Sequence, residues 1–248
     1  MVATEFEFRH RFWIIVLIYF VAFYCYAIDP TPMAGFSLHI IYGGVAKASG
    51  VSSKGGLREV YAIGAVLALL AAALRTWATA YLHKDVVFDQ ALHSDRLVAD
   101  GPYRYVRNPL YLGGLLLTDG MGLFASRLGF VMIIVLMWFF YRRLIGREEM
   151  MLERASPDAF RKFCAAVPRL WPALSPQLPA GGGKPHYGQA FSGELFMWGF
   201  AAVTIVFTVT EDFRWVSISC GVIVLLRGLS NLSHRRKAKS SGIQAQGE

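Results

Sequence analysis

The chain has 248 residues, of which 55% are apolar and 17% charged, and its formal net charge is +8. The charged share is too low for an ordinary soluble domain, in which about a quarter of the residues are charged. Its three cysteines (Cys25, Cys164 and Cys220) have no metal-ligand spacing. The sequence therefore predicts neither a zinc site nor a disulfide framework.

The apolar runs predict an all-α, polytopic transmembrane bundle of about six spans, since one span needs about 20 mainly apolar residues. The first run, residues 12–28, is long and aromatic, so we interpret it as a retained span rather than a signal peptide. The fourth run is short, and we expect it to form a tight hairpin with the third around Ser126. The later spans are predicted over residues 60–82, 109–125, 128–141, 194–210 and 215–230.

These runs divide the chain into four regions. Residues 1–58 hold the first span and a connection, residues 59–172 form a core, residues 173–192 form a linker, and residues 193–248 form a two-span extension with a basic tail.

Lysine and arginine are distributed unevenly between the two sides of this predicted bundle. The side that holds both termini carries 18 of them and the opposite side carries five. Because positive loops stay in the cytoplasm, both termini and the long polar segments are predicted to be cytoplasmic. The basic tail (residues 235–239) is explained by this topology, or by weak attraction to anionic lipid. We expect no nucleic-acid partner.

The segment LVADGPYRYVRNPLYLG (residues 97–113) is too polar for a span and too rich in aromatic, glycine and proline residues for a simple linker. Asp100-Gly101-Pro102 favours a turn, and Pro109 suits the first turn of a helix. One interpretation is a membrane-interface belt, with Tyr103 and Tyr105 at headgroup depth. The other is a functional site at the cytoplasmic face.

A charged cluster follows the fourth predicted span. One interpretation is a solvated helix end with ion pairs four residues apart. The other is a site for a zwitterion such as a free amino acid head group, because arginine binds a carboxylate in a fork and glutamate accepts from an ammonium. The cluster consists of Arg142, Arg143, Arg147, Glu148, Glu149 and Glu153.

Together, the two clusters resemble the isoprenylcysteine carboxyl methyltransferase and phospholipid methyltransferase family of integral membrane enzymes. The resemblance covers residues 74–172, with the motifs in the family's order and a hydrophobic hairpin between them. The matching positions are Leu97, Val98, Gly101, Tyr103, Arg107, Pro109, Tyr111 and Gly113, then EEMML at 148–152, and VPR at 167–169 followed by Pro172. It implies a membrane-embedded methyltransferase that uses S-adenosylmethionine. The implied acceptor is lipid-like or prenylcysteine-like, modified by carboxylate O-methylation or lipid N-methylation.

The resemblance also implies roles for individual residues. Glu148 would hold the ammonium of the cofactor's methionine part, and a tyrosine can face a sulfonium through a cation–π contact. Arg143 or Arg147 would meet the cofactor's carboxylate or a substrate anion. The implied cofactor-binding residues are Leu97, Val98, Tyr103, Asn108, Pro109, Leu110, Tyr111 and Glu148.

Three further residues are candidates for catalysis or substrate binding. Arg107 and Glu149 are candidate catalytic residues, and the candidate proton acceptors for an amine or hydroxyl substrate are Glu149 and Asp119. Asp119 lies within a predicted span, where an ionisable side chain indicates function, and we assign it to substrate binding. The alternatives for Asp119 are that it is neutral or bonded to a neighbouring helix, or that the span is displaced so that it faces water. Arg75 and Arg227, also within spans, are expected to pair or to extend to the interface.

This chain departs from the family pattern at three places. Asn108 replaces the family's common histidine, Phe160 and Phe163 replace paired tyrosines, and two predicted C-terminal spans lie beyond the family core. Two other functions remain as alternatives: a sterol-reductase-like enzyme that uses NADPH, and a non-enzymatic small transporter or scaffold. The glutamate pair favours methyl transfer over the reductase. A transporter would show paired halves, and no internal repeat is visible.

Overall fold

The computed structural model describes residues 2–42, 53–82, 100–212 and 214. Within these residues the chain is helical, with one isolated bridge between Pro32 and Ser126 and no strand. The all-α prediction is confirmed for this part of the chain. The α-helices are α1 (Glu5–Arg9), α2 (Arg11–Tyr24), α3 (Met33–Tyr42), α5 (Ser53–Tyr81), α7 (Pro109–Gly122), α8 (Arg127–Ala155), α9 (Pro157–Ala166), α10 (Tyr187–Gly193) and α11 (Leu195–Thr210), and the 3-10 turns are η1 (Cys25–Ala27) and η2 (Gly101–Arg104).

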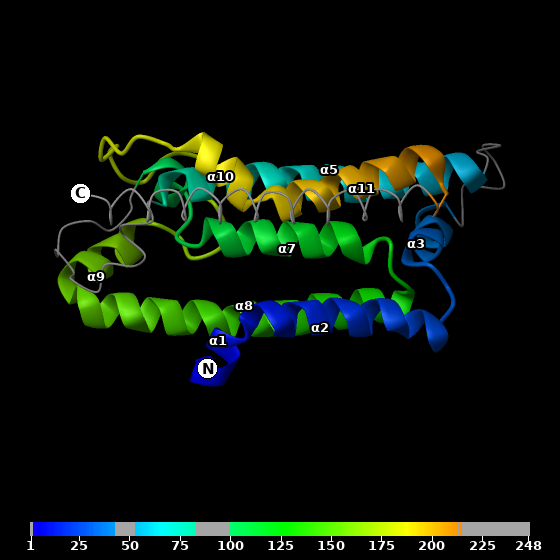
Figure 1. Ribbon diagram of the computed structural model, residues 1–248, viewed down its shortest axis with the longest axis horizontal. Coiled ribbons are helices and arrows are strands. Elements are labelled where there is room, and N and C mark those ends of the chain that lie inside the picture. Colours follow the sequence, from blue (N-terminus) through cyan, green and yellow to red (C-terminus); the bar gives the residue numbers. More distant parts are fainter. Residues whose placement is uncertain (1, 43–52, 83–99, 213, 215–248) are drawn as a thin grey trace, which may run out of the picture.

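The longer helices lie side by side along the long axis of the molecule (Figure 1). They pack in the order α11, α5, α7, α8 and α2, so that α7 lies at the centre. At one end, on the left of Figure 1, α7 begins and α8 continues into α9. At the opposite end α3 packs against α5 and α8. The end at which α7 begins carries the candidate site.

Small residues bring α5 and α7 together. A Cβ atom on Gly120 would lie 2.6 Å from the carbonyl oxygen of Gly64, and a Cβ atom on Gly113 would lie 2.5 Å from Cγ of Arg75. In a membrane, helices associate through close packing of this kind, because lipid tails are as apolar as the side chains. The start of α7 is therefore fixed against α5.

The interior between α2 and α8 is apolar, with Ile133, Met137 and Leu144 fully buried. Large side chains such as Trp13 and Phe20 on α2 are instead exposed on the outer surface. An outward apolar surface of this kind is expected of a chain whose solvent is lipid, because the hydrocarbon core accepts apolar groups without cost.

The prediction of six spans is reproduced only in part. Within the described residues, two helices are long and apolar enough to cross a membrane: Gly55–Tyr81 of α5, and α8. A third is counted if α10 and α11, which are bent by 64°, form one span. The chain is therefore a multi-pass membrane protein, with two or three candidate spans in the part that the structure describes. The apolar stretch Arg11–Ala27 and the 14 residues of α7 are shorter, and the predicted span over residues 215–230 lies outside the described residues.

Helix α8 is much longer than the predicted fourth span. It continues from Arg127 to Ala155, a length of 29 residues, instead of ending at Tyr141. The apolar run marks where the helix leaves the hydrocarbon, whereas the charged residues that follow are good helix formers and no proline interrupts them before Pro157. The predicted hairpin around Ser126 is confirmed, because α7 ends at Gly122, α8 begins at Arg127 and the two helices pack together. The Ser126 hydroxyl caps α8 by accepting from the Gly129 amide (3.0 Å).

Candidate active site

The chain that leads into α7 is held on two sides. Gly101 has a φ of +57°, a left-handed conformation that suits glycine. A Cβ atom there would lie 2.4 Å from Cδ2 of Tyr81, at the end of α5. Further along, the amide of Arg107 donates to the carbonyl of Pro168 (2.8 Å). Pro109 takes the first position of α7, as the sequence predicts.

Tyr103 does not lie in an interface belt. Its side chain is buried, with 9% of the residue exposed. Burial raises the pKa of Tyr103 above its ordinary value, and the negative charge of Glu148 adds to the rise. Tyr105 instead packs against Trp77, with ring centroids 6.0 Å apart. The predicted cofactor residue Tyr103 therefore belongs to the protein interior.

Glu148 and Tyr111, both predicted cofactor ligands, are in contact. The hydroxyl of Tyr111, in the first turn of α7, donates to Oε1 of Glu148 on α8 (2.8 Å). The ring of Tyr111 meets Tyr141 edge to face, with centroids 5.2 Å apart. A Cβ atom on Gly114 would lie 2.5 Å from the Tyr141 hydroxyl, so this glycine leaves room for the aromatic pair. The two motifs converge at one point between α7 and α8.

Glu149 joins three segments that are far apart in sequence. Its Oε2 lies 2.7 Å from Nη2 of Arg169, and its Oε1 lies 3.6 Å from Nη2 of Arg107. Asn108 donates from Nδ2 to Oε1 of Glu149 (3.3 Å) and to the carbonyl of Arg169 (3.1 Å). The asparagine that replaces the family's histidine thus acts as a donor that ties the start of α7 to α8 and to the segment after α9.

The two neighbouring carboxylates have different environments. Glu149 faces two guanidinium groups, those of Arg107 and Arg169. Glu148 has a neutral phenol as its hydrogen-bond donor. Glu149 is therefore fixed by ion pairs, while the negative charge of Glu148 is available to a cationic group of a ligand.

Arg143 and Arg147, which the sequence assigns to substrate binding, meet the N-terminal helix. Nη2 of Arg143 lies 2.7 Å from Oε2 of Glu7, and Nη2 of Arg147 pairs with Glu5. Nη1 of Arg147 also donates to the carbonyl of Ala3 (3.1 Å). The hydrogen bond from Arg143 lowers the pKa of Glu7 to about 2. These contacts fasten α1 to α8 beside the site.

The remaining predicted residues lie elsewhere. Asp119 is exposed on α7, about 12 Å along the helix from Tyr111 at 1.5 Å per residue. The structure does not bring it to the glutamate pair. Leu97 and Val98 lie outside the described residues. The expected partner of Arg75 is found in Glu194, whose Oε2 lies 2.7 Å from Nε of the arginine.

An open pocket of about 420 Å³ adjoins Glu149 between α8, α9 and the N-terminal segment. Arg142 and Arg169 bring positive charge to its wall, and Phe160 and Cys164 bring an apolar face from α9. Burial raises the pKa of the Cys164 thiol, so the thiol stays protonated at neutral pH. The pocket is large enough for part of a small molecule or for a lipid head group.

Two residues of this site carry no predicted role in the sequence. Arg169 belongs to the VPR motif. The sequence feature that could have pointed to it is its position, because it is a cation about 20 residues after the glutamate pair, at the end of an amphipathic helix. Tyr141 ends an apolar run and resembles any other interface tyrosine, so only the contact with Tyr111 marks it.

The residues present fit S-adenosylmethionine. Its methionine part carries an ammonium and a carboxylate. Glu148 offers a negative charge for the ammonium. Nε of Arg107 and Nε of Arg169 are buried and have no hydrogen-bond partner among the residues that the structure describes. Buried donors of this kind need an acceptor, and a bound carboxylate supplies one.

Residues 60–157 match the family model described as phospholipid methyltransferase. This segment belongs to the phospholipid methyltransferase family. Enzymes of this family use S-adenosylmethionine, so the chain is a membrane-embedded S-adenosylmethionine-dependent methyltransferase. No curated protein and no solved structure gives a significant match to the chain. The matched segment includes the start of α7 and both glutamates, and it ends before Arg169 and before α10 and α11.

Proposed function

We propose that this methyltransferase modifies the polar head of an amphiphilic acceptor that reaches the site from the bilayer. The acceptor is a lipid or a prenylcysteine-like molecule, and the reaction is lipid N-methylation or carboxylate O-methylation. The single observation that carries this proposal is the position of Glu148 on α8. It follows the last residue of the apolar run, Tyr141, by about two helical turns, so the site lies where the membrane-crossing helix leaves the hydrocarbon.

An acceptor with an apolar tail is suited to this position. Its tail stays among the lipid chains beside exposed side chains of α8 such as Trp138 and Phe139. Its head reaches the level of Glu148 and of the pocket beside Glu149. A water-soluble acceptor would gain nothing from a site built on a transmembrane helix. The family description supports a lipid as the acceptor.

The bound cofactor supplies a methyl group on a sulfonium, which leaves readily in an in-line displacement. The protein's task is then to hold and align the reactants. In this proposal Glu148 holds the ammonium, Arg107 and Arg169 meet the carboxylate, and Tyr103 and Tyr111 line the site. Leu97, Val98 and Leu110 stay predicted cofactor contacts of the same segment.

The contacts support separate roles for the two candidate catalytic residues. In this proposal Arg107 orients Glu149 and offers its Nε, which has no hydrogen-bond partner among the described residues, to the cofactor's carboxylate. Glu149, predicted to accept a proton, is held by Arg107, Arg169 and Asn108. Such pairing favours a positioning role. A carboxylate acceptor needs no base, and an amine acceptor can lose its proton to water at the interface.

The charges at this end of the bundle support a cytoplasmic site. Arginines on α8 and α9, among them Arg142 and Arg161, lie at the end where α7 begins. Because positive segments remain in the cytoplasm, we infer that the site and both termini face that side.

The proposal is tested by incubating the purified protein with methyl-labelled S-adenosylmethionine and total membrane lipid. We expect label in one lipid class, which chromatography and mass spectrometry identify. Label found only in water-soluble molecules would contradict an acceptor from the bilayer. A variant with Glu148→Gln is the matched control for label that arises without the site.

A further inference from the structure

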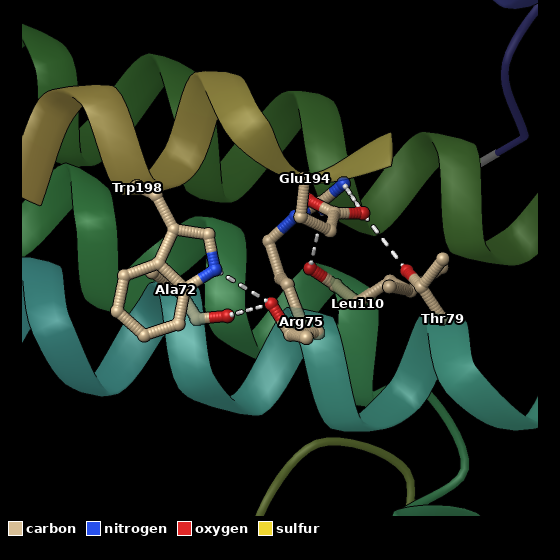
Figure 2. A network of polar contacts seen from close by, with 7 residues as sticks. Ala72, Arg75, Thr79, Leu110, Glu194 and Trp198 are labelled. Atoms are coloured by element: carbon tan, nitrogen blue, oxygen red, sulfur yellow. Dashed lines mark hydrogen bonds and ion pairs between the residues drawn. The ribbon is translucent and has the colours of Figure 1, made fainter. Parts of the chain in front are cut away.

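A buried ion pair ties the C-terminal helices to the site, although these helices lie outside the matched segment. Glu194 stands at the bend between α10 and α11 and is 7% exposed. Its two oxygens accept from Nε and Nη2 of Arg75 on α5 (2.7 and 3.1 Å), and Oε1 also accepts from the Thr79 hydroxyl (2.8 Å), as Figure 2 shows. Three donors from a single helix fix the carboxylate in position.

The third nitrogen of the same guanidinium reaches the site. Nη1 of Arg75 donates to the carbonyl of Leu110 (3.1 Å), which lies between Pro109 and Tyr111 in the first turn of α7 (Figure 2). The guanidinium is a rigid plane, so the edge that Glu194 holds determines the direction in which Nη1 points. The contact of Glu194 with Arg75, at the bend before α11, thereby determines the contact of Arg75 with the Leu110 carbonyl at the start of α7.

A further observation places this link at the start of α7. A Cβ atom on Gly113 would lie 2.5 Å from Cγ of Arg75, so the arginine lies against α7 only because this position is glycine. The guanidinium therefore contacts the same first turn of α7 that holds the predicted cofactor residues Pro109 and Tyr111.

We propose that Glu194 is a positioning residue of the methyltransferase: through Arg75 it holds the first turn of α7, and with it Asn108 and Tyr111, against the glutamate pair of α8. This inference rests on the proposed function, because Tyr111 and Asn108 belong to the proposed cofactor site. If Glu194 has this role, α10 and α11 contribute to cofactor binding, although they lie outside the matched segment.

The experiment measures binding of S-adenosylmethionine to the full-length protein in nanodiscs, without added acceptor, by calorimetry. Glu194→Gln keeps the size of the side chain but removes the charge that orients the guanidinium. We expect the dissociation constant to rise at least fivefold. A second variant, Arg75→Lys, keeps a positive charge opposite Glu194 but cannot serve both the carboxylate and the Leu110 carbonyl. For Arg75→Lys we expect a similar rise in the dissociation constant, and a smaller loss of thermal stability than for Glu194→Gln.

The matched control is Trp198→Phe. Trp198 lies at the same α5–α11 interface and donates from Nε1 to the Thr76 hydroxyl (2.9 Å), which itself donates to the Ala72 carbonyl (2.8 Å). The substitution removes one hydrogen bond of that interface and leaves Arg75 in place. We expect a lower melting temperature and a dissociation constant within twofold of wild type.

Two outcomes would overturn the proposal. Unchanged affinity in Arg75→Lys and Glu194→Gln would mean that the link does not reach the site. Affinity that falls equally in Trp198→Phe, in step with the melting temperature, would mean that Glu194 only stabilises the fold. Either result is distinct from failure of the proposed function, in which the wild-type protein binds the cofactor and methylates no lipid.

Discussion

Replacement of Glu148 by glutamine tests the central contact of the proposed site. The glutamine oxygen can still accept from the Tyr111 hydroxyl, which lies 2.8 Å from Oε1 in the native structure. The fold at the α7–α8 contact should therefore persist, while the negative charge offered to the cofactor's ammonium is lost. A hydrogen bond to a charged group contributes about 1.5–3 kcal/mol. Since about 1.4 kcal/mol is tenfold in affinity, we expect the dissociation constant of S-adenosylmethionine to rise about 10- to 100-fold.

The assay is calorimetry on the purified protein, with a melting curve of the same preparation. Tyr111→Phe serves as a companion variant, because it removes the donor to Glu148 and keeps the ring against Tyr141. We expect it to have a smaller effect than Glu148→Gln. Wild-type affinity in Glu148→Gln, at an unchanged melting temperature, would remove Glu148 from the cofactor site.

Three further predictions follow from charges at the same end of the bundle. Arg107→Lys should lower the single-turnover rate at saturating cofactor at least tenfold, because the point charge of lysine cannot replace the planar guanidinium fork and a displacement of about 1 Å in the site costs about 100-fold in rate. A wild-type rate would mean that the arginine only anchors the helix at the membrane interface. The pKa of Glu7 is about 2 in the folded protein, against an ordinary 4.5, so its stabilising ion pair persists above pH 4.5 and is lost as the pH falls toward 2. The melting-temperature difference between wild type and Glu7→Gln should thus be constant above about pH 5 and shrink below pH 4; a difference that does not depend on pH would refute the pairing. In a cysteine-free background, cysteines at Ser175 and Pro30 should be labelled from opposite sides of the membrane, and labelling from one side would contradict a site at the cytoplasmic end.

Much of the candidate site can be predicted from the sequence, because the order of the motifs along the chain determines which of them meet in the fold. The start of a helix at Pro109 and the meeting of Tyr111 with Glu148 are both anticipated by the order of the motifs, since a hairpin of two helices returns the second motif to the first. Asn108, which the sequence predicts as a cofactor ligand, lies at the same place, beside Glu149. Its bond to Glu149 follows from the geometry of that turn, which the sequence does not show.

Partners of the arginines could not be predicted in the same way. Arg143 meets Glu7, which lies 136 residues away in the sequence, and Arg147 meets Glu5. Any nearby carboxylate satisfies a guanidinium equally well, so composition cannot choose between a substrate and the protein's own N-terminal helix. The length of α8 could not be predicted for a related reason. Hydropathy shows where a helix contacts lipid, whereas α8 continues for 14 residues after the apolar run ends at Tyr141.

The contacts also explain why two glutamates stand next to each other. Consecutive residues on a helix point about 100° apart, so the orientation of one sets the orientation of the other. Glu149 is fixed by Arg107 on the α7 side and by Arg169 on the α9 side. Rotation of α8 about its axis would break both ion pairs, and the cost of leaving such groups unpaired opposes it. Glu149 thus holds α8 at the angle at which Glu148 faces Tyr111, and the second glutamate of the pair places the first.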